Sequence, residues 1–385
     1  MLPHPKLSRS VSAIGGSVYS GYVERAAARG GEVYPFHVGD TWLSPAEGCR
    51  LEDVHASEVR GLNQYAPVRG LPALLEALVE RQRARTGAPT ERDNVLVTGG
   101  ATAGLACAVG AIAEPGDEVL ILAPYWPLIA GIVRCFHATP VPVPFFGAAD
   151  SAQSAVEVVR ARRTPRTVAL YLNSPNNPTG RVIPRARIEA LVGWAAREGL
   201  WILADEVYED MIFEGTHTYS RSISPERVIA AHSFSKAYGM AGYRCGYLAG
   251  PAEVLNEALK VSTHTVYATT TAAQHAALRV LGGAGDAWIA AARERYRQIG
   301  AAAAQRLGVA APEGSTFLFL DVVEHLGERG LSGFLADCAD RGLLLAPGPS
   351  FGPFETHVRL CYTAAAPEVT ERGVAVLAEL MACNG

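Results

Sequence analysis

The chain has 385 residues, of which 49% are hydrophobic and only 19% are charged. This much apolar surface can form a core, which excludes a disordered or low-complexity protein. The 34 Lys and Arg against 38 Asp and Glu give a net charge of −4, which argues against nucleic acids and anionic membranes as main partners. The seven cysteines form no C-x-x-C pair, so we expect free thiols, no metal site and a cytoplasmic protein.

Short apolar strands alternate with helical segments from residue 95 to about residue 250. The uncharged stretch 94–113 is interpreted as a strand, a turn and a buried helix rather than a membrane span, because it contains Gly99-Gly100. A second helix is expected at 188–198. Such apolar strands between helices indicate an α/β fold, with a mostly parallel sheet covered by helices. The strands are predicted at residues 95–98, 118–122, 167–172, 200–204, 227–231 and 243–249.

Beyond residue 250 the pattern changes to a smaller α+β segment. Helices are expected at 251–261, 271–281, 287–307 and 331–341, and strands at 317–322 and 358–362. The first residues do not follow the α/β alternation either. The predicted division is an N-terminal arm with part of the small domain (1–45), a large α/β domain (46–280) and a small α+β domain (281–385).

Polar residues follow several of the predicted strands, at the edge where open α/β sheets bind ligands. The turn Gly100-Ala101-Thr102 opens a helix and offers free N–H groups to an anion such as phosphate, although many such turns bind nothing. The loop N-S-P-N-N-P-T-G at 173–180 is a fixed polar loop or an ordinary turn. Within it, Asn177 precedes a proline, which would aim its amide at the strand ends.

Charged side chains follow the next two strands. Asp205 ends a buried strand, where a carboxylate needs a partner: a helix cap or an arginine, or else a protonated ring nitrogen or a metal. Lys236, one of only three lysines, ends the run S-F-S-K, with Arg244 eight residues on. It is either a surface lysine or a Schiff-base nucleophile beside a phosphate-binding arginine. Taken together, a phosphate turn, an acid, a lysine and an arginine at one sheet edge predict a pyridoxal-phosphate site.

Four motifs make the sequence similar to the class I/II aminotransferases, which are fold type I pyridoxal-phosphate enzymes. The motifs are N-S-P-N-N-P-T-G (173–180), D-E-V-Y (205–208), S-F-S-K (233–236) with G-Y-R-C-G (242–246), and V-R-L (358–360). The resemblance runs from about residue 33 to residue 377. It implies a large cofactor domain with a smaller α+β domain, and transfer of an amino group between an L-α-amino acid and a 2-keto acid.

The resemblance also implies roles for individual residues. Lys236 would form the Schiff base and move the proton, and Asp205 would pair with the pyridine nitrogen. Arg359 would bind the substrate carboxylate, next to the backbone of Gly39. Tyr65 would reach the phosphate in a neighbouring subunit, which implies a homodimer with shared sites. Tyr208 and Asn177 would hydrogen-bond the phenolic oxygen of the cofactor, and Trp126 would stack on its ring. The residues expected to bind the phosphate are Ala101, Thr102, Ser233, Ser235 and Arg244.

The reaction and the substrate stay open at this level. The same residues support a β-lyase, a decarboxylase, a cyclase or an oxidase, because the bond that breaks depends on substrate orientation. An aminotransferase-like transcription regulator would need a DNA-binding module, and no basic helix-turn-helix is seen. Asp40, after Gly39, could favour a cationic side chain. Candidates to line an apolar side-chain pocket, or simply to pack between domains, are Tyr19, Trp42, Tyr267 and Phe351.

Overall fold

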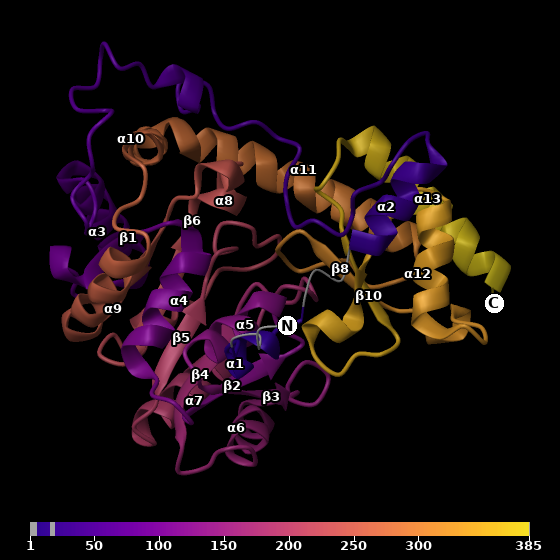
Figure 1. Ribbon diagram of the computed structural model, residues 1–385, viewed down its shortest axis with the longest axis horizontal. Coiled ribbons are helices and arrows are strands. Elements are labelled where there is room, and N and C mark those ends of the chain that lie inside the picture. The colour runs from indigo at the N-terminus through magenta and orange to yellow at the C-terminus, as the bar shows by residue number, and fades with distance from the viewer. Residues whose placement is uncertain (1–5, 16–19, 385) are drawn as a thin grey trace, which may run out of the picture.

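The computed structural model describes residues 6–15 and 20–384, and its centre is a seven-stranded sheet (Figure 1). The strand order is β1-β7-β6-β5-β4-β2-β3, in which β7 is antiparallel to both of its neighbours and the other pairs are parallel. The predicted mostly parallel sheet is therefore confirmed. The strands are β1 (Val95–Thr98), β2 (Glu118–Ala123), β3 (Thr139–Pro144), β4 (Thr167–Asn173), β5 (Trp201–Asp205), β6 (Val228–Ser233) and β7 (Gly246–Ala249).

The edge strand β3 was not expected from the sequence. It reads T-P-V-P-V-P, and prolines at every second position argue against a strand because they cannot donate to the ladder. The structure accommodates them because β3 pairs only with β2, so one side of the strand needs no donors. The expected strand at 243–249 is also shorter, because residues 241–243 form a 3-10 turn and Arg244 has a left-handed φ of 52°.

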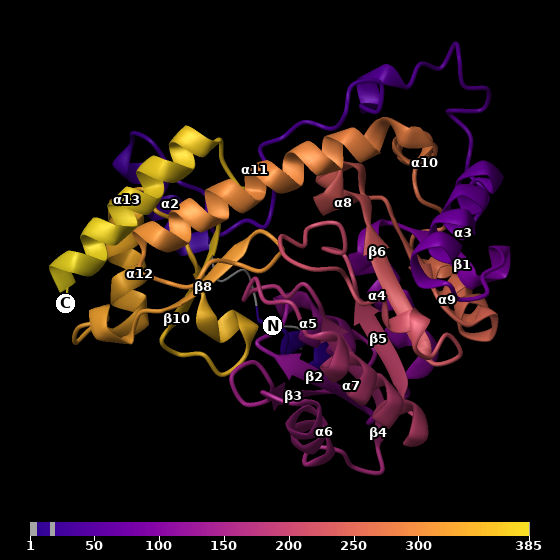
Figure 2. The same ribbon diagram turned by 180° about the vertical axis from the view of Figure 1, so that it is seen from behind.

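Helices cover both faces of the sheet, as the apolar strands require. One face carries α4 (Gly100–Ile112), α5 (Pro127–Cys135) and α9 (Ala252–Thr265), with Leu105, Ile129 and Leu255 in the shared core. The other face carries α6 (Ala152–Arg160) and α7 (Arg185–Arg197), which pack on each other and lie toward the viewer in Figure 2. Two further helices, α3 (Pro72–Thr86) and α10 (Thr271–Arg279), pack together beside β1.

A second, antiparallel sheet in the order β8-β10-β9 lies beside the first. The long helix α11 runs from the seven-stranded sheet to this smaller sheet in both views (Figures 1 and 2). The N-terminal helix α2 packs on α12, and Tyr34 forms a β-bridge with Leu343. The predicted domain boundaries stay a prediction. The elements here are α2 (Ser20–Arg29), α11 (Gly285–Arg306), β8 (Phe317–Asp321), α12 (Gly330–Asp340), β9 (Ala346–Pro347), β10 (His357–Cys361) and α13 (Pro367–Asn384).

The topology brings the ends of β4, β5 and β6 side by side. Asn173 is paired with Asp205, and Asp205 with Ala231, so the polar residues that follow these strands share one edge of the sheet. The short helices α1 (Arg9–Ser12) and α8 (Phe234–Ala237) complete the described elements, apart from single turns. Over residues 6–15 and 20–384, no helix combines the length and the hydropathy that a membrane span requires.

Candidate active site

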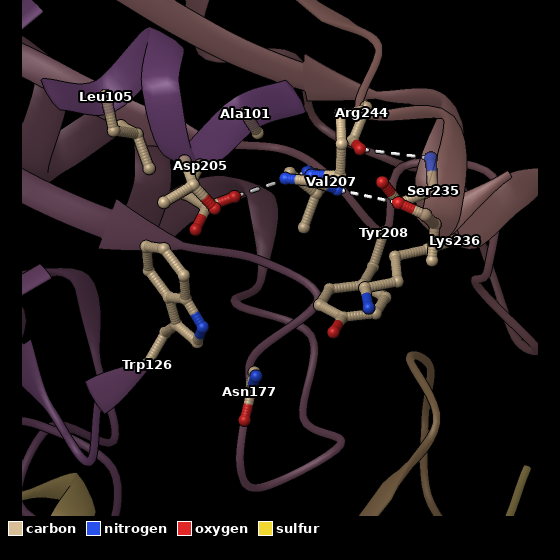
Figure 3. Close-up of a pocket in the computed structure, with 13 residues that line it drawn as sticks. Ala101, Leu105, Trp126, Asn177, Asp205, Val207, Tyr208, Ser235, Lys236 and Arg244 are labelled. Carbon is tan, nitrogen blue, oxygen red and sulfur yellow. Dashed lines mark hydrogen bonds between the residues drawn. The ribbon is translucent and has the colours of Figure 1, made fainter. Parts of the chain in front are cut away.

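A cavity of about 120 Å³ opens at this edge of the seven-stranded sheet (Figure 3). The lining comes from the first turns of α4, the residue before α5 and the loop after β4. It also includes the end of β5 with the turn that follows it, and the segment from the end of β6 to Arg244. Most residues expected at the site are therefore brought together. The lining residues are Ala101, Thr102, Leu105, Trp126, Asn177, Asp205, Val207, Tyr208, Ser233, Ser235, Lys236, Ala241 and Arg244.

The turn between β1 and α4 brings backbone N–H groups and a guanidinium together. Gly100 has a φ of +80°, a conformation that favours glycine, and α4 begins at this residue. Arg244 lies over the turn, because a Cβ built on Gly100 would fall 2.6 Å from its Nη2. The guanidinium also donates to the Ala241 carbonyl at 2.8 Å. The free N–H groups at a helix start and the fixed positive charge form an anion site.

Asp205 is a buried carboxylate held in a fixed orientation at the end of β5. Its Oδ2 accepts a hydrogen bond of 2.7 Å from the Tyr171 hydroxyl, and its backbone carbonyl accepts one of 2.8 Å from Asn173. Burial raises the pKa of Asp205 to about 6, although the hydrogen bond from Tyr171 acts to lower it. A positive charge opposite this carboxylate would lower the pKa again and keep the group ionised.

Lys236 lies in the first turn after β6. Ser233 caps α8, since its Oγ accepts a hydrogen bond of 3.1 Å from the Ser235 amide, and this fixes the turn that carries the lysine. The side chain is half-buried, and its Nζ donates to the Gly39 carbonyl. Burial lowers the pKa of Lys236, and the charges of Arg359 and Arg244 lower it further, against opposite effects of Cys361 and Asp40. A lysine with a lowered pKa is a better base and nucleophile near neutral pH.

Arg359 lies beyond the lysine, on β10 of the smaller sheet. Its Nη1 donates to Asn177 Oδ1 at 3.0 Å, and its Nη2 donates to the His37 carbonyl at 2.6 Å. The guanidinium carbon lies over two aromatic rings, 4.4 Å from the centre of Phe317 and 5.0 Å from that of Phe351. These contacts fix a planar, always charged group that suits a carboxylate.

Tyr208 and Trp126 complete the pocket. The Tyr208 ring is buried and packs edge-on against Phe317 at 5.8 Å. Burial raises the pKa of Tyr208, so the hydroxyl stays protonated and can donate a hydrogen bond. Trp126 precedes α5 and points its indole ring into the cavity beside Asp205 in Figure 3. An aromatic face, a hydroxyl donor and a buried acid thus surround one space.

Three expected site residues do not line this pocket: Gly39 and Arg359, which contact the lining residues Lys236 and Asn177, and Tyr65, which lies apart from it. The Tyr65 side chain is 86% exposed and packs edge-on against Tyr267 at 5.0 Å. Among the candidates for a substrate side-chain pocket, Phe351 lies under Arg359 and Trp42 packs on Tyr296. Tyr19 falls outside the described residues.

Four residues contribute to the pocket without having been expected. Leu105 lies one helical turn after Ala101, and Val207 lies inside the D-E-V-Y motif, so the spacing alone could have identified both. Ala241 lines the pocket and accepts a hydrogen bond from Arg244 through its carbonyl. Tyr171 is fully buried in β4, and the apolar strand pattern gave no signal that its hydroxyl would reach Asp205.

The donor set fits pyridoxal phosphate. A buried acid and a lysine with opposite pKa shifts lie in one pocket with an anion site at a helix start. An acid for a ring nitrogen, an amine for an aldehyde, a flat aromatic wall and a phosphate site are the groups that this cofactor requires. Within the described part of the chain, no group of three or more His, Cys, Asp or Glu could hold a metal ion.

Comparisons with known proteins agree with this geometry. The family model "Aminotransferase class I and II" matches residues 45–377. A probable aspartate/prephenate aminotransferase of Thermus aquaticus is 36% identical over 314 residues, covering 79% of this chain and 80% of that protein. An arginine–pyruvate transaminase of Pseudomonas aeruginosa is 33% identical, covering 87% and 88%. A Thermus thermophilus aspartate aminotransferase structure, a single mutant, has a TM-score of 0.88 at 30% identity and covers 98% and 100%.

Proposed function

Since the chain belongs to the class I and II aminotransferases, we propose that it uses pyridoxal phosphate held by Lys236 to move an amino group between an L-α-amino acid and a 2-keto acid. The observation that carries this proposal is the pairing of Lys236 and Asp205 in one pocket. Both side chains line this pocket, where burial raises the pKa of Asp205 to about 6 and lowers the pKa of Lys236, which favours the neutral amine that a base requires.

Several residues would bind and orient the cofactor. The phosphate would be held by the amides at the start of α4 and by four side chains that line the pocket: Thr102, Ser233, Ser235 and Arg244. Trp126 would cover one face of the ring. When bound, pyridoxal phosphate supplies an electron sink that stabilises negative charge on the α-carbon of the substrate.

The proton transfers would use residues of this chain. Asp205 would hold a proton at the ring nitrogen, with the Tyr171 hydroxyl fixing the carboxylate orientation. Tyr208 and Asn177 would hydrogen-bond the phenolic oxygen. Lys236, once free, would take the proton from the α-carbon as a general base, which requires its neutral form.

Arg359 would select the substrate class. Its guanidinium, fixed by Asn177 and the His37 carbonyl, is suited to bind an α-carboxylate next to the backbone of Gly39. The names of the relatives point to two kinds of amino donor, aspartate and arginine. Because Asp40 adds a negative charge beside Gly39, we propose arginine as the better donor of the two.

We also propose that the active protein is a homodimer. Tyr65 is 86% exposed and packs on Tyr267, which is itself 46% exposed and follows the exposed Val266, so that large apolar side chains gather here at the surface. A second copy of the chain would cover these residues and bring Tyr65 to the partner's phosphate site.

The test is an absorbance spectrum of the purified protein with pyridoxal phosphate, for wild type, Lys236→Ala and Lys260→Ala. Lys260 is the matched control, because it is exposed and paired with Glu257 on α9. Wild type and Lys260→Ala should show the band of a lysine-linked cofactor, and Lys236→Ala should bind the cofactor without it. Turnover of Lys236→Ala should fall about 10²–10⁴-fold, the usual contribution of a general base.

The same spectra identify the reaction and the donor. Arginine or aspartate, added without a keto acid, should release one equivalent of the matching keto acid and leave the cofactor in its amine form. Release of ammonia or carbon dioxide with return of the band would contradict transamination. Full turnover by Lys236→Ala would show that the role proposed for this lysine is wrong.

A further inference from the structure

A cluster of buried charges lies behind the turn that carries Asp205 and Tyr208. The turn follows β5, and its residues Asp205, Val207 and Tyr208 line the pocket. The next two residues, Glu209 and Asp210, contact helix α3 instead. The proposed function gives these two acids no role, although acids this buried need a specific partner.

Two arginines on α3 provide that partner. Arg85 Nη1 lies 2.7 Å from Glu209 Oε2, and Arg85 Nη2 lies 2.6 Å from Asp210 Oδ1. Arg81, one helical turn earlier, places its Nη2 2.8 Å from Asp210 Oδ2. None of the four side chains is more than 21% exposed. Two positive and two negative charges therefore balance in a poorly solvated space.

The cluster also reaches the strand that leads to Lys236. His232 Nδ1 lies 3.1 Å from Glu209 Oε1, and the imidazole ring stacks on Tyr247 at 4.6 Å. His232 directly precedes Ser233, which caps the turn of Lys236. Glu209 thus joins three elements: α3, the turn after β5 and the end of β6.

Compared with apolar packing, this cluster of charges fixes the orientation of the side chains that it contains. Buried ion pairs contribute little net stability compared with apolar side chains of the same size, because desolvation offsets their attraction. The two arginines hydrogen-bond Asp210 from both sides, whereas Glu209 is held by the ion pair with Arg85 and by its hydrogen bond with His232 Nδ1 at 3.1 Å. Together these contacts fix both acids in one geometry. Reacting groups lose rate steeply when they are displaced by as little as 1 Å.

We propose that Glu209, held by Arg85 at 2.7 Å and with Arg81 Nη2 4.0 Å away, positions Asp205 and Tyr208 for the reaction. None of these three residues lines the pocket, so they act through the turn and are positioning residues rather than catalytic ones. This proposal rests on the proposed function, because it assumes that Asp205 and Tyr208 bind pyridoxal phosphate.

The test compares Glu209→Gln with Glu118→Gln in the full-length protein loaded with pyridoxal phosphate. Glu118 is the matched control, since it is also buried, with its side chain 8% exposed, and paired with an arginine, Arg166, at 3.1 Å. It begins β2, at the end opposite to the pocket edge. Any effect of losing a buried carboxylate on folding alone should appear in both variants.

Three readouts are measured: kcat with KM, the Kd of pyridoxal phosphate from tryptophan fluorescence, and the pH midpoint of the cofactor absorbance. In Glu209→Gln we expect kcat about tenfold lower, a several-fold higher Kd and a displaced pH midpoint. Glu118→Gln should match wild type in all three. If Glu209→Gln does not fold, Arg85→Lys replaces it, because a lysine keeps the charge but cannot bridge both acids.

A Glu209→Gln or Arg85→Lys protein with wild-type Kd and pH midpoint would overturn the proposal. Equal losses in Glu118→Gln would do the same, because they would indicate a general effect on folding. Both results would leave the proposed function intact, since wild type would still show the lysine-linked band. A wild-type protein without that band would overturn both proposals together.

Discussion

Asp40 is exposed and follows Gly39, whose carbonyl accepts a hydrogen bond from Lys236 Nζ. Burial lowers the pKa of Lys236, and the negative charge of Asp40 acts in the opposite direction. The Asp40→Asn substitution removes that opposing charge, so the pKa of Lys236 should fall further. Because only the neutral amine acts as a base, the acidic limb of the kcat profile should move to lower pH, by about half a unit or less for an exposed charge.

The measurement is kcat against pH for wild type and Asp40→Asn, with a neutral amino donor so that substrate charge does not intervene. The prediction would be contradicted if the acidic limb of the kcat profile of Asp40→Asn stayed at the wild-type pH or moved to higher pH. With arginine as donor the same variant should also lose kcat/KM relative to the neutral donor, which tests the proposed preference separately.

Arg359 is the second residue whose chemistry can be tested alone. Its guanidinium donates to Asn177 and to the His37 carbonyl and contacts the rings of two phenylalanines. A lysine at this position keeps the charge but loses the fork. Hydrogen bonds to charged groups contribute about 1.5–3 kcal/mol. Arg359→Lys should therefore raise KM for an amino acid about tenfold or more.

The control for Arg359→Lys is a second substrate that lacks the α-carboxylate, measured with both proteins. An amine without an α-carboxylate should react equally slowly with both proteins, since it has no group for the arginine to bind. A KM within twofold of wild type for the amino acid would show that Arg359 does not bind the carboxylate.

At the scale of single elements, the turn between β1 and α4 makes the sharpest prediction. Gly100 has a φ of +80°, and a Cβ there would lie 2.6 Å from Arg244 Nη2. Gly100→Ala should strain the turn and displace the guanidinium from the anion site. We expect a Kd for pyridoxal phosphate about tenfold higher, because one charge-assisted contact to the phosphate is weakened.

Gly99→Ala is the matched control for this turn. Gly99 has a φ of −66°, and the nearest atom to a Cβ there is Ala103 Cβ at 3.6 Å, an ordinary contact. Its Kd for the cofactor should stay within about twofold of wild type. Equal Kd values for the two variants would show that Arg244 does not hold the phosphate.

The elements also show what can be predicted from the sequence. Asp205 and Lys236 were identifiable because they directly follow apolar strands, and parallel strands bring such residues to one edge. The cluster of Arg81, Arg85 and Glu209 was not, because charges on a helix usually indicate a solvated face. Its burial depends on α3 packing beside a turn that lies more than a hundred residues away. A local sequence pattern does not indicate contacts between residues that lie so far apart in the chain.

At the scale of the whole molecule, the exposed Tyr65 leads to a prediction about assembly. The single chain does not need this side chain for its core, since it is 86% exposed. If Tyr65 completes the phosphate site of a second copy, Tyr65→Ala should weaken cofactor binding while leaving thermal stability unchanged. The protein should have twice the chain mass of 40.7 kDa in light scattering.

Mixing two impaired proteins, at a pyridoxal-phosphate concentration too low to load Tyr65→Ala, tests whether the sites are shared. A Lys236→Ala chain supplies an intact Tyr65, and a Tyr65→Ala chain supplies an intact Lys236, so a mixed dimer contains one complete site. Random exchange makes half of the dimers mixed, and activity should therefore recover to about a quarter of wild type. Wild-type activity of Tyr65→Ala alone would show that the tyrosine has no role in a shared site. No recovery on mixing, although mass spectrometry under native conditions detects mixed dimers, would mean that each chain builds its site from its own residues.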